Sequence, residues 1–372
     1  MGLVESSLKR SRKSNLTADA ISTMKYIRRA QHAGSWYSSD RSELDGMLTN
    51  FLEEARSASS SNLEHDEKKD GKGQVGIPRA CICPHAGFQY SGLTAAFSFL
   101  ALEEAVQKNL SLRTIVVLHP SHHVYLDGCA ISVVMLISIL LLACLASTLG
   151  AAKIETPLGN LEVDNQLREQ LLLTGKFTTM KRSEDEDEHS GEMQYPFISK
   201  VLSNSGMLKQ HNGNCFTVRV LPIMVGSIRP VKEEAFGKLF SSVLCDPEIF
   251  TVISSDFCHW GKRFGYVPLP SSNLGVPVDE VYEYIQHLDR KGMDIIEMQK
   301  PGAFADYLRE YSNTICGRHP IGVWLHSVVV NAKEGRERLE VRFVKYDQSG
   351  KARSIKDSSV SYASAVARSL PI

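Results

Sequence analysis

The sequence predicts a single α/β domain with a central, mostly parallel β-sheet and helices on both of its faces. Short apolar, β-branched runs of strand length occur at 80–83, 114–118, 217–225 and 250–253. Segments with helical spacing of apolar residues lie between them, and this alternation is typical of parallel strands joined by helices. With 43% hydrophobic and 23% charged residues, a chain of 372 residues has the composition of a soluble protein with a full core.

The chain carries no formal net charge, because 42 lysines and arginines balance 42 aspartates and glutamates. We therefore expect no long-range field that would recruit nucleic acid or an anionic membrane. The eight cysteines lack zinc-finger spacing, and no cleavable signal peptide opens the sequence. These features favour reduced thiols in a cytosolic compartment over a disulfide framework.

Residues 1–28 are polar and basic without a sustained apolar period, so we expect a disordered extension before a domain that covers 29–372. A second interpretation remains open. The first six residues, MGLVES, fit the N-myristoylation pattern at Gly2, and the basic cluster that follows is the kind of second signal that holds a lipidated protein on a membrane. Met24 is an alternative start of translation that would remove both the myristoylation pattern and the basic cluster.

Helical spacing and turn composition predict the elements in between. A helix begins at Asp40 or Ser42 and ends near Ala58, and residues 57–76, rich in Ser, Asp, Lys and Gly, form a solvated loop. Further helices are expected at 92–108, 161–174, 192–202, 232–243, 279–293, 301–311 and 321–330.

An atypical apolar insert at about 133–152 interrupts this pattern. Residues 133–146 form a run of fourteen in which Ser138 is the one polar residue. The run is shorter than the roughly 20 residues that a membrane-spanning helix needs, so we favour a translated intron or an error in the gene structure over an evolved anchor. We expect that deletion of 134–152 raises the soluble yield, because such a run exposed on a globule promotes aggregation.

Imidazoles follow three of the predicted strands directly. His85 comes after 80–83, His122 comes after 114–118, and residues 254–259 after the fourth strand include an aspartate, a cysteine and a histidine. Residues just past the carboxyl ends of strands gather in one crevice of an open α/β sheet. This placement predicts a metal or acid/base site, and a plain polar turn after each strand is the alternative.

Two further groups are candidates for the same site. Cys316 lies beside Arg318 and His319 near the start of a helix, which favours a thiolate, although an ordinary buried cysteine fits the sequence equally well. His189 and Glu192, three positions apart after an acidic run, would share one helix face. The acidic run itself is typical of a solvated loop.

Seven segments together resemble the Memo family, mediators of cell motility driven by receptor tyrosine kinases. They are HAGSWY at 32–37, PHAG at 84–87, PSHH at 120–123, DEDEHS at 185–190, SSDFCHWG at 254–261, NTICGRHP at 313–320 and DSSVSYA at 357–363. The resemblance spans roughly 29–366 and implies a fold like that of the class III extradiol dioxygenases, non-haem iron enzymes with a two-histidine, one-carboxylate triad. It also implies a cytoplasmic protein, with the nucleus as an alternative, that binds phosphotyrosine peptides and acts on the cytoskeleton.

Carried over residue by residue, the resemblance makes His85, His122 and Cys316 the ligands of an iron or copper ion. Asp256 and His259 would line the same pocket and take a catalytic role. Further residues expected in or around the pocket are His32, Trp36, Tyr90, His123, His189, Glu192, Cys258, Trp260 and Arg318. Two imidazoles and a thiolate leave open positions on either metal.

Two residues depart from the family pattern, His119 in place of a glycine and Gln194 in place of a frequent histidine. His119 would crowd the pocket, and Cys316 replaces the carboxylate ligand of the dioxygenases, so we expect no extradiol ring cleavage. Three functions stay open: a metal-binding redox and signalling protein, an adaptor for phosphorylated or acidic peptides, and a diverged non-haem iron dioxygenase. The sequence identifies neither the substrate nor the oligomeric state.

Overall fold

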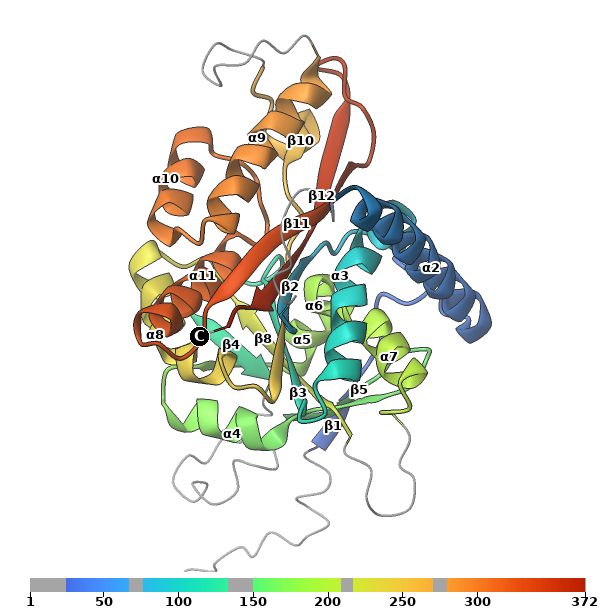
Figure 1. The fold of residues 1–372 in the computed structure, drawn as a ribbon, viewed down its shortest axis with the longest axis vertical. Coiled ribbons are helices and arrows are strands. Elements are labelled where there is room, and N and C mark those ends of the chain that lie inside the picture. Colours follow the sequence, from blue (N-terminus) through green and yellow to red (C-terminus); the bar gives the residue numbers. More distant parts are fainter. Residues whose placement is uncertain (1–24, 67–75, 133–149, 209–216, 270–279, 372) are drawn as a thin grey trace, which may run out of the picture.

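The computed structural model of the chain describes residues 25–66, 76–132, 150–208, 217–269 and 280–371. The myristoylation motif at Gly2, most of the predicted extension and most of the apolar insert lie outside these residues. The described residues form a single α/β domain with helices on both faces of a large sheet, as the sequence predicts (Figure 1). A smaller sheet of three strands accompanies the large one.

The large sheet has nine strands among the described residues, in the order β10-β12-β2-β9-β3-β8-β4-β7, with β11 paired to β12. Its four central strands are parallel: β2 (Pro78–Cys83), β9 (Ile249–Ser254), β3 (Thr114–Pro120) and β8 (Arg219–Val225). Antiparallel pairs flank this centre on both sides. On one side, β12 (Ser358–Ser369) runs antiparallel to β2, β10 (His259–Gly261) and β11 (Leu339–Gln348). On the other side, β4 (Cys129–Ser132) runs antiparallel to β8. The edge strand β7 (Thr178–Met180) is parallel to β4. The sheet is therefore mixed, and the predicted parallel pairing holds at its centre.

Burial explains why the central strands are rich in Val and Ile. Every residue of β2, β3 and β9 is buried, since helices cover both faces of the sheet. One face carries α2 (Arg41–Asp66), α3 (Phe88–Lys108) and α7 (Tyr195–Asn204) (Figure 1). The other face carries α8 (Pro230–Leu244) and α11 (Arg318–Lys333). α10 (Pro301–Tyr311) lies beside α11, and α9 (Val281–Glu297) lies beside β11. Among the described residues, no helix is both long enough and apolar enough to cross a membrane.

The small sheet corrects the predicted start of the domain. β1 (Lys25–Arg28) pairs in parallel with β5 (Gly150–Ile154), which pairs in turn with β6 (Leu161–Glu162). Residues 25–28 therefore belong to the fold and not to a disordered arm, and residues 150–152, which we assigned to the insert, form part of β5. The guanidinium of Arg28 is buried and makes ion pairs with Asp185 and Glu192 at 3.1 and 2.7 Å, contacts that no sequence period reveals.

Two predicted helices also need correction. α2 continues to Asp66, so residues 57–66 are helical and not a loop. The hydroxyls of Ser57, Ser59 and Ser60 each donate to the carbonyl four residues earlier, which lets this serine-rich segment continue the helix. The segment predicted as a helix at 161–174 begins with β6, and α4 (Asn165–Leu173) starts only after the cap residue Asp164. Two short helices, α5 (Arg182–Asp187) and α6 (His189–Glu192), lie between β7 and α7.

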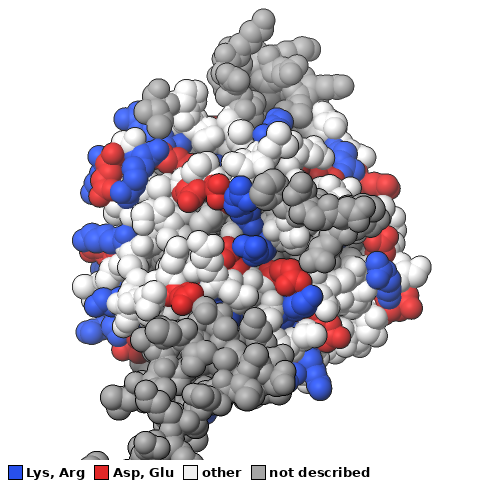
Figure 2. Space-filling view, turned by 90° about the horizontal axis from the view of Figure 1, so that it is seen from below, with Lys and Arg blue, Asp and Glu red and all other residues white. Residues whose placement is uncertain are grey.

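The surface agrees with the neutral composition. On the face shown in Figure 2, lysine and arginine side chains alternate with aspartate and glutamate side chains over the described residues. Elsewhere in the described chain, exposed charges are also paired across short distances, such as Lys153 with Glu162 at 2.7 Å and Lys232 with Asp127 at 2.7 Å. Exposed pairs of this kind contribute little to stability, and the alternation in Figure 2 leaves no single-sign field on that face.

Candidate metal centre

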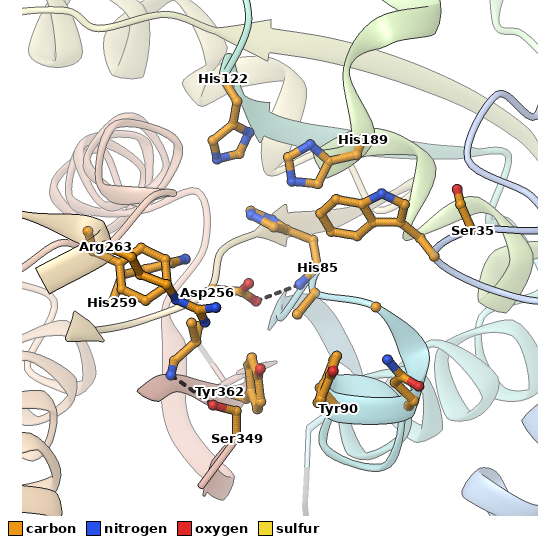
Figure 3. A pocket seen from close by; sticks show the side chains of 16 residues that line it. Ser35, His85, Tyr90, His122, His189, Asp256, His259, Arg263, Ser349 and Tyr362 are labelled. Atoms are coloured by element: carbon orange, nitrogen blue, oxygen red, sulfur yellow. Dashed lines mark hydrogen bonds between the residues drawn. The ribbon is translucent and has the colours of Figure 1, made fainter. Parts of the chain in front are cut away.

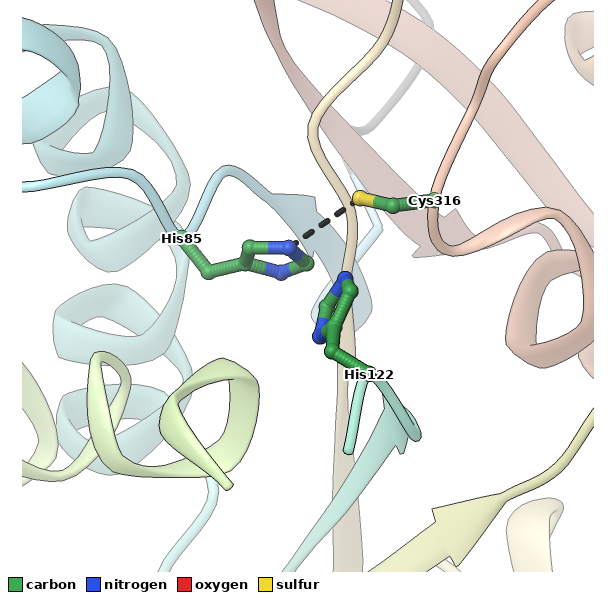
Figure 4. A group of neighbouring side chains, drawn as sticks. All are labelled: His85, His122 and Cys316. Carbon is green, nitrogen blue, oxygen red and sulfur yellow. Dashed lines mark hydrogen bonds between the residues drawn. The ribbon is translucent and has the colours of Figure 1, made fainter. Parts of the chain in front are cut away.

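Three side chains of the types that ligate metals meet at the carboxyl edge of the parallel strands. His85 follows β2, His122 follows β3, and Cys316 precedes α11. One ligand atom of each lies within 4.8 Å of the other two, and Cys316 Sγ is 3.0 Å from His85 Nε2 (Figure 4). The structure thus brings together the three residues for which the family resemblance implies a metal ion.

The hydrogen bonds behind His85 determine which ring nitrogen carries the proton. Ser254 donates its hydroxyl proton to the Ser190 carbonyl at 2.7 Å and accepts a hydrogen bond from Gln194 Nε2 at 3.0 Å. The 2.7 Å contact between His85 Nδ1 and Ser254 Oγ must therefore be donated by the imidazole. This leaves the lone pair on Nε2, the nitrogen that faces Cys316. Burial, and next the neighbouring His122, hold the pKa of His85 well below its usual range, so the ring is neutral.

Glu188 fixes His122 in the same way. Its carboxylate accepts from the His122 backbone N–H at 2.6 Å and lies 2.8 Å from His122 Nδ1. Burial alone would raise the pKa of Glu188, but the hydrogen bonds and charge of His122 hold it well below its usual range. The ionised carboxylate therefore accepts from Nδ1, and in the neutral ring Nε2 holds the lone pair, which is the carboxylate–histidine arrangement found behind metal ligands.

The loop that carries Cys316 packs tightly against the end of β9. The Asp256 N–H donates to Cys316 Sγ at 3.1 Å, and a side chain at Gly317 would meet the Ser254 carbonyl oxygen at 2.5 Å, so this approach requires glycine. Burial, and next the Asp256 carboxylate, raise the pKa of Cys316 well above its usual range. Of the two alternatives that the sequence left open, the raised pKa favours a protonated, buried cysteine over a thiolate, and a metal ion would have to displace the thiol proton.

A cavity of about 680 Å³ adjoins these ligands (Figure 3). In Figure 3, His85, His122 and His189 lie together on one side of the cavity, and Tyr90 and Tyr362 lie on the other. The volume falls in the range of small-molecule sites, and the lining combines aromatic rings with a few polar groups. The arrangement places three imidazoles beside a space that a small ligand or one side chain of a partner can fill.

Asp256 and His259, for which we expected a catalytic role, both line the cavity. His259 Nδ1 lies 2.9 and 3.2 Å from the carbonyl oxygens of Phe257 and Thr314, so this nitrogen must carry the proton. In the neutral ring, the other nitrogen then holds the lone pair. Asp256 accepts from the His85 backbone N–H at 2.8 Å, and burial raises its pKa.

Trp36, Tyr90 and His189 also line the cavity, as expected from the sequence. His189 lies between the rings of Trp36 and His122, with centroid separations of 4.4 and 4.5 Å. Burial, and next the proximity of His122, lower the pKa of His189 to about 3. The rings of His122, His189 and Trp36 form a stack that leads from a candidate metal ligand to the surface.

The remaining expected pocket residues do not line the cavity. His32 and Glu192 lie behind it, where the Glu192 carboxylate accepts from the His32 backbone N–H at 2.7 Å and from the Tyr37 hydroxyl at 2.8 Å. Cys258 and Trp260 are core residues, since they lie on the side of their segment opposite to His259. His123 is exposed and Arg318 is half-buried, and neither of them lines the cavity.

The two departures from the family pattern have different places. His119 is buried in the core, where its Nδ1 lies 3.0 Å from Ser190 Oγ, and it does not line the cavity. The expectation that His119 narrows the pocket is therefore wrong, because its ring packs against Ser190 and Gly191 of α6 instead. Gln194 is also buried, and its Nε2 donates to Ser254 Oγ behind His85.

Sequence reasoning missed several residues of this site. Glu188 ends an acidic run that is typical of a solvated loop, and only its position next to His189 pointed to another role. Ser254 lies in the recognised strand end, but its contact with His85 requires the folded sheet. Arg263 lies in the 3₁₀ turn η2 (Lys262–Phe264) and Tyr362 in β12, and both line the cavity without any periodic signal in the sequence.

Comparisons with known proteins agree with this geometry. A family model described as Memo-like protein matches residues 28–366. Protein MEMO1 of Mus musculus is 39% identical over 336 residues, which cover 90% of this chain and 95% of the mouse protein. Protein MEMO1 of Homo sapiens is 38% identical with the same coverage. The protein memo-1 homolog of Caenorhabditis elegans is 38% identical over 342 residues, or 92% of this chain and 82% of the nematode protein.

Proposed function

The chain belongs to the Memo family, and we propose that it is a metal-binding redox protein that holds one iron or copper ion through His85, His122 and Cys316. The observation that carries the proposal is the convergence of two imidazoles and a thiol within 4.8 Å, with both imidazoles held through their other nitrogen. This donor set suits soft and borderline metals, and three protein ligands leave positions open for a substrate.

A redox-active ion in this site would supply electron transfer. Residues of the chain would accept protons and position the ligands. His259, with its proton fixed on Nδ1, presents its other nitrogen as a proton acceptor at the cavity wall. Asp256 holds the His85 backbone and thereby positions that imidazole. We propose His259 as the general base and Asp256 as its neighbouring carboxylate.

Metal analysis of anaerobically purified protein tests this proposal. Alanine at His85, His122 or Cys316 should lower the metal content and reduce the metal-dependent rise in melting temperature, because an ion that binds only the folded state stabilises it. Alanine at His123 or Cys245, which lie outside the ligand group, provides the matched controls. Full metal content in the triple variant would refute the proposal.

We expect no extradiol ring cleavage, because Cys316 stands where the dioxygenases use a carboxylate. Catechols incubated with the iron-loaded protein should give no yellow ring-fission product. Turnover at about 1 per second or faster, an ordinary enzymatic rate, would favour the diverged dioxygenase instead.

A second candidate function is an adaptor for phosphorylated or acidic peptides in cytoplasmic signalling to the cytoskeleton. Arg263 favours it, since it is the one lysine or arginine among the described lining residues and makes no ion pair with any residue the structure describes. A phosphotyrosine peptide titrated into the protein should bind at least about tenfold more weakly to Arg263→Gln, because a charged hydrogen bond contributes about 1.5–3 kcal/mol. Lys262→Gln, which lies outside the lining, should bind normally. Equal affinity for phosphorylated and unphosphorylated peptide would exclude this role.

A further inference from the structure

We propose that His122, Glu188 and His189 form a second cation position beside the first, one that takes a borderline divalent ion such as Zn²⁺, Co²⁺ or Cu²⁺. One ligand atom of each lies within 4.8 Å of the other two. The group shares only His122 with the His85, His122 and Cys316 position. The proposal therefore goes beyond the redox function and does not depend on it.

The separations fit an ion bound between the three side chains. Glu188 Oε1 lies 2.8 Å from His122 Nδ1 and 3.4 Å from His189 Nδ1. Ligand atoms that surround an ion at bond lengths of about 2.0–2.2 Å lie roughly 3–3.5 Å apart. The two separations that involve Glu188 are therefore close to those of ligands around an ion, and the third is at most 4.8 Å.

The surroundings of Glu188 also suit a cation. This side chain is 1% exposed, and within the described part of the chain its ion-pair partners are His122 and His189 and no lysine or arginine. Both of these partners are potential metal ligands, so a divalent ion between the three side chains would place positive charge directly beside the buried carboxylate. The backbone N–H groups of His122 and Ser190 donate to the carboxylate at 2.6 and 3.0 Å, and the His122 ring contacts it through Nδ1 at 2.8 Å. A divalent ion would take the place of the proton on Nδ1.

The site is accessible and held in place. His122 is 28% exposed and lines the cavity with His189, so an ion can arrive through that space (Figure 3). Trp36 packs on the other face of His189, which restricts the rotation of the imidazole. A rigid pair of imidazoles and a fixed carboxylate are the conditions for a preformed site.

The shared imidazole makes the two positions alternatives. A neutral imidazole has one lone pair. When Nε2 of His122 serves the first position, Nδ1 carries the proton and donates to Glu188. When the proton sits on Nε2, Nδ1 is free to bind an ion together with Glu188 and His189. The two states are different tautomers of the ring, so the two positions exclude each other on a neutral His122.

Cobalt binding to a variant that lacks the first position tests the proposal. The tag-free His85→Ala/Cys316→Ser double variant should bind about one Co²⁺ with visible d–d absorption but without the ultraviolet thiolate-to-cobalt band that a cysteine ligand gives. Adding Glu188→Gln or His189→Ala should weaken this binding at least about tenfold. Adding His123→Ala, next to His122 but outside the group, should leave it unchanged. Circular dichroism and the melting temperature of the apo form verify the fold of each variant.

The outcome separates this site from the first one. Absence of Co²⁺ binding in the folded double variant, or binding that neither Glu188→Gln nor His189→Ala weakens, would overturn the second position. Loss of the thiolate band in Cys316→Ser alone tests the first position independently, so either can fail while the other stands.

Discussion

At the scale of single residues, the candidate metal centre depends on the hydrogen bonds that hold the far nitrogens of its imidazoles. Ser254 serves His85, and Glu188 serves His122. Each partner selects the tautomer that turns the Nε2 lone pair toward Cys316. The ligands are thus prepared before any ion arrives, and the cost of orienting them is met during folding.

Ser254→Ala should lower the metal affinity about 10- to 100-fold, because His85 loses the acceptor that keeps the proton on Nδ1. Competition with a chelator of known affinity measures this change. Ser98→Ala is the matched control, since Ser98 is equally buried and donates to the Ile82 carbonyl at 2.6 Å away from the ligands. Equal affinity losses in the two variants would mean that a general loss of packing, and not the tautomer, is responsible.

Asp289 makes the stability depend on pH. It is fully buried, and burial raises its pKa to about 6, although hydrogen bonds from Ser361, Asn313 and Tyr346 act to lower it. The unfolded pKa is about 3.8, so the folded state favours the protonated acid. The stabilisation of the folded state by this group is fully present below about pH 4. It is lost as the pH rises through about 6, which lowers the free energy of unfolding by about 3 kcal/mol in total.

Asp289→Asn removes this titration. Between pH 4.5 and 7, the free energy of unfolding of the variant should rise relative to wild type by about 2 kcal/mol, as measured by urea unfolding. A difference that stays constant over this range would show that Asp289 keeps an ordinary pKa.

At the scale of elements, the short strand β1 anchors the segment that carries Glu188 and His189. The Arg28 guanidinium donates to the carbonyls of Asp185 and Glu188 at 2.8 and 3.0 Å and pairs with the Glu192 carboxylate. Glu192 in turn holds the turn at His32. One buried cation therefore links two segments that reach the cavity.

Arg28→Met should destabilise the fold by about 3–5 kcal/mol, because it leaves the carboxylates of Asp185 and Glu192 buried without a cation. Arg29→Met, at the exposed neighbouring position, should change stability by less than about 0.5 kcal/mol. Chemical unfolding of both variants provides the comparison. Similar losses in both would contradict the role given to the buried guanidinium.

Elements differ in how well the sequence predicts them. The central strands have apolar, β-branched runs because both faces are covered, and the strand ends then locate His85 and His122. β12, by contrast, is rich in Ser and Ala, and its strand conformation follows from pairing with β2, β10 and β11. β1 has only four residues in a basic context. Such elements are determined by tertiary partners, which periodicity does not report.

At the scale of the whole molecule, the ends of the apolar insert lie close together. Gly150 has a φ of +121°, and a Cβ there would lie 2.5 Å from the Ser132 carbonyl oxygen. Val133 alone can then connect Ser132 to Gly150. The insert can be removed without stretching the chain, provided that β5 is kept.

Deletion of 134–149 should preserve cooperative unfolding and metal content and raise the soluble yield. Deletion of 134–152, which we considered from the sequence alone, should instead destabilise the fold, because it removes the β5 residues that pair with Lys25 and Tyr26. Thermal unfolding distinguishes the two. A shorter deletion that fails to fold would show that the insert belongs to the native core.

X-ray absorption spectroscopy of the zinc-loaded chain tests the central claim most directly, since zinc reports the ligands without redox change. We predict one sulfur at about 2.3 Å and nitrogens at about 2.0–2.1 Å, with the sulfur absent in Cys316→Ser. A wild-type spectrum with nitrogen and oxygen neighbours alone, identical to that of Cys316→Ser, would contradict the His85, His122 and Cys316 metal centre.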